Sequence, residues 1–339
     1  MTAVTPINKA ATKPAPKMGV RRGKISVPRR LAVYGPPGVG KTTLVGDVPG
    51  VVVFDLEGGT ESIDLPRFYF RDEKMGYIPR DLEEFRAGLR WLLTEPHDYK
   101  AIGLDTMDKL EELILRFICK RDQVDNVEGY GFGKGWVAFV DEFRTVLQQL
   151  DLLRERRGMH VIGLVHAKIV KHSDPAGGDW DRWTMKLHDK VVGLFIEWCH
   201  EIGFVHFVDK TTKASRWAKA KGLSKGERII EFDRSATWDA KTRLALPPTV
   251  KVGIESPWAP IQDAIDRVDV GADELVRLIG EELARIGDDE LRPKVEESIT
   301  KAAGNVSTLS KYLHGLRRRD AVEPSAAAPT STDVLGGGA

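Results

Sequence analysis

The stretch "YGPPGVGKTT", residues 34 to 43, constrains the fold of this chain more than any other feature. It follows an apolar strand-like run, opens a helical pattern, and fits the spacing G-x-x-x-x-G-K-[ST]. Glycines let backbone N–H groups approach a chain of phosphates, Lys41 adds a point charge, and the Thr42 hydroxyl can ligate magnesium. The predicted residues for ATP and Mg²⁺ are Gly35, Pro36, Pro37, Gly38, Val39, Gly40, Lys41, Thr42 and Thr43. The alternative is a glycine-rich turn that binds nothing, but strand, spacing and helix all favour the phosphate loop.

The composition limits the classes of protein to which this chain can belong. A chain of 339 residues is long enough for one large domain and a smaller one. Its net charge of +1 requires any surface for nucleic acid to be local. The two distant cysteines, Cys119 and Cys199, indicate a reducing compartment and argue against a zinc site or a disulfide framework. The chain lacks a long apolar stretch and an apolar N-terminal segment, so we expect a cytoplasmic protein with no membrane partner.

The order of apolar patterns predicts the architecture. Strand-like runs alternate with helical patterns from Ile25 to about residue 248, which predicts an α/β fold with a doubly wound, mainly parallel sheet. The strands are expected at 30–34, 51–55, 101–105, 160–166 and 201–208. We predict a disordered basic arm at 1–23, an ATPase core at 24–250, a small helical C-terminal domain at 256–319 and a flexible tail at 320–339.

Two predicted strands end in carboxylates that suit phosphate chemistry. Asp105 ends the run "AIGLD" and is expected to hold magnesium together with Thr42. Residue 106 is a threonine, so the position after Asp105 supplies no general base. Glu57 follows the run "VVVFD" and would orient a water against the γ phosphate and accept its proton. The alternatives are an Asp105 that only caps a turn and a Glu57 that is only solvated.

Taken together, the short motifs of this chain resemble a known family. "GPPGVGKTT", "DLEGG", "LDT", "GYGFGKGW" and "LVHAK", in this order, resemble the phage-type RecA-like P-loop ATPases of single-strand annealing and recombination, which are AAA-type ATP-binding proteins. The resemblance covers about residues 28 to 248. It implies a RecA-like P-loop core, a homo-oligomeric ring or filament, and single-stranded DNA as partner. A single-strand DNA-binding protein would be a further partner, and a phage-encoded chain would act in the host cytoplasm.

The resemblance also assigns roles to three residues outside the phosphate loop. His166 takes the place of the polar residue that senses the γ phosphate, where a glutamine is usual in RecA itself. Lys241 and Arg243 match two cations that reach the ATP of a neighbouring subunit, and in a strand they would share one face. The catalytic set is thus Glu57, Lys41, Lys241, Arg243 and His166. The alternatives are a histidine bonded to local backbone and two solvated charges on an edge strand.

Two further stretches mix cations with aromatic residues where the family's DNA-binding loops lie. Aromatic faces stack on any base and cations attract phosphate, so this mixture suits a single strand. The predicted DNA-binding residues are Lys120, Arg121, Tyr130, Phe132, Lys134 and Trp136 in the first stretch, and Lys168, Lys171, Trp180, Arg182, Trp183 and Lys186 in the second. The alternative is that these aromatic residues support mobile loops structurally.

The motifs and the resemblance lead to one expected function and one rival. We expect an ATP- and Mg²⁺-dependent ATPase that binds single-stranded DNA and promotes annealing or recombination as an oligomer. The rival is a DNA motor or loader that remodels a protein or translocates on DNA. A small-molecule kinase is disfavoured because no arginine-rich lid follows the core helices.

Overall fold

The computed structural model describes most of the chain between residues 27 and 316, together with Gly19 and Val20. Within that range the residues not described are 75, 175–176, 213–220, 245, 254–255, 270–271, 288–290, 303, 305–307, 310–311 and 314–315. The expected tail lies outside the described residues, as does the expected basic arm apart from Gly19 and Val20. None of the helices in the described part is long and apolar enough to cross a membrane.

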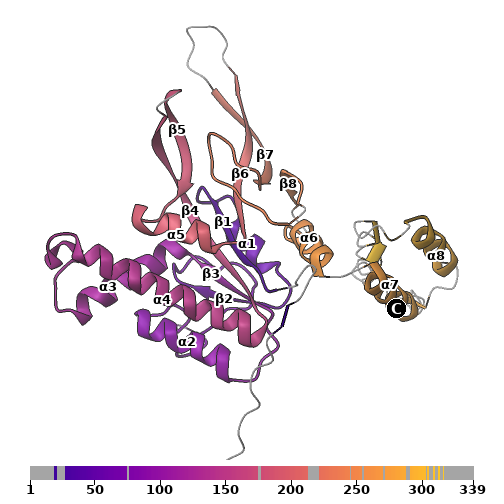
Figure 1. Cartoon of the computed structure of the whole chain (residues 1–339), viewed down its shortest axis with the longest axis horizontal. Helices are drawn as coiled ribbons and strands as arrows, with labels where there is room; N and C mark the ends of the chain where they lie inside the picture. The colour runs from indigo at the N-terminus through magenta and orange to yellow at the C-terminus, as the bar shows by residue number, and fades with distance from the viewer. Residues whose placement is uncertain are drawn as a thin grey trace, which may run out of the picture.

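A single sheet of eight strands forms the centre of the molecule, with helices against both of its faces (Figure 1). The strands are β1 (Arg30–Gly35), β2 (Val51–Asp55), β3 (Ala101–Asp105), β4 (His160–Asp174), β5 (Gly178–Met185), β6 (Glu201–Thr212), β7 (Lys221–Glu231) and β8 (Thr249–Val252). Their order is β2-β3-β4-β1-β6-β7-β8, and β5 pairs with β4. The neighbours from β2 to β6 are parallel, whereas β5, β7 and β8 are antiparallel to their partners. The expected α/β fold with a mainly parallel sheet is therefore confirmed.

The sheet separates two layers of apolar core, and helices cover each of them. They are α1 (Lys41–Gly46), α2 (Leu82–Thr94), α3 (Met107–Arg121), α4 (Lys134–Arg157), α5 (Asp189–Trp198), α6 (Ala259–Asp269), α7 (Ala272–Ile286) and α8 (Leu291–Ala302), with a 3-10 turn, η1, at Val127–Tyr130. Helices α2 to α5 cover one face of the sheet, and α1 and α6 cover the other. Strands β2 and β3 are buried along their whole length, as expected of continuous apolar runs in a parallel sheet covered on both faces.

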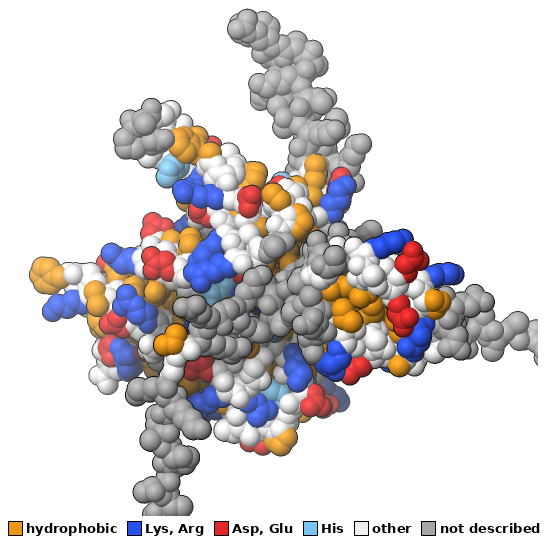
Figure 2. Space-filling view, turned by 45° about the vertical axis from the view of Figure 1, so that its right-hand side comes forward, with side chains coloured by type: hydrophobic (Ala, Val, Ile, Leu, Met, Phe, Trp, Pro, Cys, Tyr) orange, Lys and Arg blue, Asp and Glu red, His pale blue; other side chains and the backbone are white. Residues whose placement is uncertain are grey.

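Two long β-hairpins extend the sheet beyond its parallel part (Figure 1). Strand β4 continues past the end of β1 and turns back as β5, with Ala167 opposite Met185, and β6 and β7 form the second hairpin. The second predicted DNA-binding stretch is thus a paired β-ribbon, not the loop we expected, because its backbone groups bond to each other. On the face shown in Figure 2, Lys and Arg side chains are interspersed with Asp and Glu, without one continuous basic patch.

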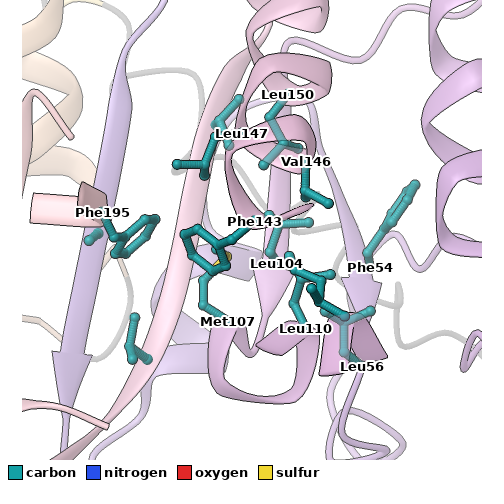
Figure 3. Packing of buried hydrophobic residues seen from close by; sticks show 14 of the residues in the cluster. Phe54, Leu56, Leu104, Met107, Leu110, Phe143, Val146, Leu147, Leu150 and Phe195 are labelled. Carbon is teal, nitrogen blue, oxygen red and sulfur yellow. The ribbon is translucent and has the colours of Figure 1, made fainter. Parts of the chain in front are cut away.

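The larger core layer holds α3, α4 and α5 against the sheet (Figure 3). Phe143 of α4 lies between Leu104 of β3 and Phe195 of α5, and the two phenyl rings meet edge to face at 6.3 Å. Such contacts between large buried rings add to the free energy gained by burying apolar area. Because α3 starts directly after β3, this packing fixes the position of the α3 N-terminus at the carboxyl end of the sheet.

Helix α6 belongs to the core layer on the opposite face. Trp258, Ile261 and Ile265 lie in the same buried cluster as Leu44 of α1. Our predicted boundary grouped α6 with the C-terminal helices, and the packing does not agree with it, because the apolar side of α6 covers the sheet. Helix α7 instead contributes to a separate apolar cluster with Leu309, Leu313 and Leu316. A C-terminal domain of its own therefore remains a prediction only for the chain from α7 onwards.

The stability of the fold should depend on pH through Glu201, a fully buried carboxyl at the start of β6. Burial raises the pKa of Glu201 to about 7, and Arg29, 3.7 Å away, offsets this only in part. A folded-state pKa above the unfolded value of about 4.3 means that the stabilising contribution is complete below about pH 4.3 and is lost as the pH rises to about 7. Glutamine cannot ionise, so the variant does not lose this contribution. The free energy of unfolding of Glu201→Gln minus that of wild type should therefore rise by about 3 kcal/mol from about pH 4 to about pH 8.

Urea unfolding of both proteins at the two pH values measures this difference. Glu155→Gln, at an exposed position of α4, serves as the control and should show no such change. A difference between Glu201→Gln and wild type that is the same at both pH values would contradict the raised pKa.

Candidate nucleotide site

The predicted phosphate loop joins β1 to α1 with the backbone shape that its glycines permit. Gly38 and Gly40 have φ angles of 77° and 91°, in the left-handed region that favours glycine. Gly40 also caps the N-terminus of α1. Lys41 is only 6% exposed, and its Nζ donates to the carbonyls of Gly35 (3.1 Å) and Pro36 (3.0 Å). Burial lowers the pKa of Lys41, although Asp105, Asp108 and Glu57 act in the opposite direction.

Thr42 and Asp105 meet although they come from different elements. The Thr42 hydroxyl donates to Asp105 Oδ2 over 2.7 Å. Asp105 is 5% exposed, and burial, with the nearby Asp55 and Glu57, raises its pKa despite the hydrogen bond from Thr42. A hydroxyl beside a carboxylate fits Mg²⁺, which is usually held by few protein oxygens, phosphates and water. Among the described residues, no group of three or more His, Cys, Asp or Glu side chains could hold a metal ion.

Asp55 shapes the loop that carries Glu57. It is fully buried, and its Oδ1 accepts from the backbone N–H groups of Glu57 (3.0 Å) and Gly58 (2.6 Å). Its Oδ2 accepts from the backbone N–H and the hydroxyl of Thr60. These four bonds occupy Asp55, whereas the Glu57 side chain is 39% exposed and faces His166, with 3.8 Å between Oε2 and Nε2. Asp55 therefore positions the loop that carries Glu57, the predicted base. The sequence alone assigned no role to Asp55.

His166 lies on β4, between the nucleotide site and the first hairpin, which β4 and β5 form. It pairs with Gly35 in the sheet register, and its carbonyl accepts from the Lys186 N–H over 2.7 Å. Its ring Nδ1 lies 3.0 Å from Asp108 Oδ2. Sequence reasoning missed Asp108, and the only local signal was an acid in the first turn of the helix that follows Asp105.

Lys241 and Arg243 do not share one face of a strand as we expected. Among the described residues of 239–247, the pairing with the sheet is an isolated bridge from Lys241 to Ile202. Lys241 Nζ donates to the carbonyls of Ile196 (2.9 Å) and Cys199 (2.7 Å) at the end of α5. Helix ends leave carbonyls without partners, and a lysine is well suited to bond them. Lys241 therefore stabilises α5 in this structure, whereas Arg243 is exposed.

The first predicted DNA-binding stretch follows α3 and contains both supporting and projecting residues. Tyr130 donates to the Ile118 carbonyl over 2.8 Å, and the Trp136 ring stacks on His188 with 3.9 Å between ring centres. Phe132 instead is completely exposed, with a φ of 49° between two glycines that also have positive φ. Lys120, Arg121 and Lys134 are exposed as well, and Arg121 pairs with Asp122 and Glu142.

In the second stretch, some side chains are engaged inside the fold and others are exposed to solvent. Arg182 is 8% exposed and forms an ion pair with Asp239, while Trp183 packs on Phe204 with 5.8 Å between ring centres. The expectation that these two side chains meet DNA does not agree with their positions, because both are engaged inside the fold. The remaining predicted side chains are only partly engaged or exposed: Lys168 donates to the Leu187 carbonyl, Trp180 to the Ala236 carbonyl, Lys171 pairs with Asp179, and Lys186 is exposed.

The fold and the site together define a P-loop protein of the α/β class. The sequence matches the AAA domain family over residues 27–244, and the chain belongs to that family. Families of this kind generally use ATP and Mg²⁺. No curated protein matches the chain. Among solved structures, the crystal structure of the RadB recombinase aligns with 15% identity and a TM-score of 0.36 over 68% of this chain and 90% of that one.

The pair formed by Thr42 and Asp105 yields a test that separates stability from binding. Asp105→Asn removes a buried carboxyl with a raised pKa, while its amide oxygen can still accept the Thr42 hydroxyl hydrogen. We expect the melting temperature without ligand to be maintained. Stabilisation by ATP with Mg²⁺, about 2.7 kcal/mol for wild type at a ligand concentration of about 100 times Kd, should be lost.

Thermal unfolding with and without ATP and Mg²⁺ measures both effects. Asp64→Asn, an exposed carboxyl in the loop after β2, is the matched control and should behave as wild type. An Asp105→Asn protein that ATP still stabilises in a Mg²⁺-dependent way would remove Asp105 from the metal site.

Proposed function

We propose that this chain is a RecA-like ATPase that hydrolyses ATP with Mg²⁺, binds single-stranded DNA and promotes annealing or recombination as an oligomer. The observation that carries the ATPase part is the convergence of three groups at the carboxyl edge of the sheet: the phosphate loop with Lys41, the pair of Thr42 and Asp105, and the exposed Glu57. Ligands of open α/β sheets bind at this edge.

Each of these residues has a defined part in the proposed reaction. The backbone N–H groups of the phosphate loop hold the phosphates, and Lys41 exchanges its two carbonyl acceptors for phosphate oxygens. Thr42 and Asp105 hold Mg²⁺, which supplies positive charge against the charge that develops on the phosphates. Glu57 orients a water in line with the γ phosphate and accepts its proton. His166, whose Nε2 lies 3.8 Å from Glu57, would contact the same phosphate.

For single-stranded DNA, the support comes from the two elements that extend from the region of the nucleotide site. Phe132 presents a bare aromatic face at a glycine-flanked tip, next to Lys134. The first hairpin adds Lys171 and the half-buried Trp180, and Lys186 follows it directly. Exposed aromatic rings with nearby cations bind bases and phosphates without regard to sequence. We leave Arg182 and Trp183 out of this surface because they are engaged in the interior.

In a ring or filament, a second copy of the chain would supply a residue to the nucleotide site of the first. Arg243 is exposed, and an arginine supplied across an interface stabilises the charge of phosphoryl transfer. Lys241 takes no part in this proposal, because its ammonium bonds the end of α5. Annealing of complementary strands without unwinding, with ATP turnover stimulated by single-stranded DNA, would support this function. Directional translocation or unwinding would instead support the motor.

Replacing Glu57 separates hydrolysis from binding. Glu57→Gln keeps the size of the side chain but cannot accept a proton, so turnover of ATP should fall by at least about 100-fold, the scale of a lost general base. The affinity for ATP, measured by titration with a fluorescent nucleotide, should remain within about twofold.

Glu61→Gln is the matched control, since Glu61 lies in the same loop and its exposed carboxylate accepts from the Tyr77 hydroxyl. This variant should hydrolyse ATP as wild type does. Near-normal turnover by Glu57→Gln would assign the base to another residue and contradict the proposed mechanism.

Phe132 provides the corresponding test of the DNA surface. Loss of one stacked base costs about 1–3 kcal/mol, so Phe132→Ala should weaken binding of a short single-stranded oligonucleotide by about 5- to 150-fold. ATP hydrolysis without DNA should not change. Val137→Ala, also exposed and one turn into α4, should bind the oligonucleotide as wild type does. Equal affinities of Phe132→Ala and wild type in fluorescence anisotropy would exclude this tip from the DNA surface.

A further inference from the structure

Asp108 is a buried acid that the proposed reaction does not use. It lies in the first turn of α3 and is only 7% exposed. A buried carboxylate needs hydrogen-bond donors to offset the loss of water. Two donors come from His166: the backbone N–H lies 3.2 Å from Oδ1, and the ring Nδ1 lies 3.0 Å from Oδ2. A histidine at the nucleotide site is thus held at two points by one acid.

These contacts determine which ring nitrogen of His166 carries hydrogen toward Asp108. Burial alone would raise the pKa of Asp108, but the hydrogen bonds from the His166 ring and backbone outweigh it and hold the pKa below its usual range. Asp108 is therefore ionised at neutral pH, and an ionised carboxylate can only accept hydrogen bonds. Nδ1 of His166, which faces it, must carry the hydrogen.

The opposite side of the same ring faces the proposed base. Nε2 of His166 lies 3.8 Å from Oε2 of Glu57, and the His166 side chain is 17% exposed. The backbone of His166 is held on both sides, because its carbonyl accepts from Lys186 and its N–H donates to Asp108. Rotation of the His166 side chain about its Cα–Cβ bond would break the contact between Nδ1 and Asp108. The direction of Nε2 therefore depends on Asp108.

We propose that Asp108 is a positioning residue for hydrolysis: it fixes the His166 ring with hydrogen on Nδ1 and so keeps Nε2 directed at Glu57 beside the phosphate loop. Asp108 itself touches neither phosphate nor water in this role and acts only through His166. The inference rests on the proposed function, since it has meaning only if Glu57 acts in ATP hydrolysis.

Asp108→Asn tests the role with little change of shape. The new amide can donate to Nδ1, and the ring hydrogen then lies on Nε2. The ring nitrogen that faces Glu57 becomes a hydrogen-bond donor where in wild type it is an acceptor. We expect kcat for ATP to fall by about 10- to 100-fold, as for other residues that orient a functional imidazole, with KM within about twofold. Glu112→Gln, an exposed acid on the same helix that pairs with Lys109, is the matched control and should keep wild-type kcat.

A double-mutant cycle distinguishes action through His166 from a general structural effect. If Asp108 acts only through the ring, Asp108→Asn should cause no further loss of kcat in a His166→Ala protein. Losses that multiply in the double variant would overturn the inference, because Asp108 would then act independently of His166.

The position of the ring hydrogen can be measured in the wild-type chain itself. In ¹⁵N-labelled protein, with the His166 signals assigned from the His166→Ala variant, we expect hydrogen on Nδ1. Hydrogen on Nε2 alone would overturn the inference, even if Asp108→Asn failed to fold. A wild-type chain without ATPase activity would overturn the proposed function and this inference together. Loss of turnover in Glu57→Gln but full turnover in Asp108→Asn would overturn the inference alone.

Discussion

The hydrogen bond from Thr42 to Asp105 connects two parts of the sheet that are not neighbours. Strand β4 separates β1, which leads into the phosphate loop, from β3, which ends in Asp105. The two residues can meet over 2.7 Å because β1 and β3 end at the same edge of the sheet, each in parallel register with β4 between them. The parallel sheet, covered by helices on both faces, holds this edge in place. Every other part of the candidate site is arranged around that contact.

Four acids lie near the phosphate loop, and their surroundings give them different tasks. Asp55 accepts four hydrogen bonds from the loop that it shapes. Asp105, buried beside other acids, has a raised pKa and suits a bound cation. Asp108 has a lowered pKa and bonds His166, whereas Glu57 is exposed enough to reach a water. In the proposed function, carboxylates would thus serve structure, metal binding, positioning and proton transfer, because burial and donors differ at each place.

The proposed DNA surface shows how supporting and binding residues share a short segment. Around η1, Tyr130 and Trp136 fix the loop by a hydrogen bond and a ring stack, while Phe132 is left fully exposed. In the first hairpin, Arg182 is buried while its neighbour Asp181 is exposed, and Lys186, directly after β5, is exposed as well. The ribbon begins directly after His166, which places it next to the proposed base.

The sequence by itself determined the phosphate loop, the buried parallel strands and the acids at their ends, because these depend on spacing within a few residues and on local apolar patterns. It could not determine that Lys241 bonds the end of α5, that Arg182 is buried beside Asp239, or that α6 packs on the core. It also left Asp108 without a role, since that residue meets a histidine 58 positions away. These contacts depend on strand register and helix packing, which bring distant side chains together only once the whole sheet has formed.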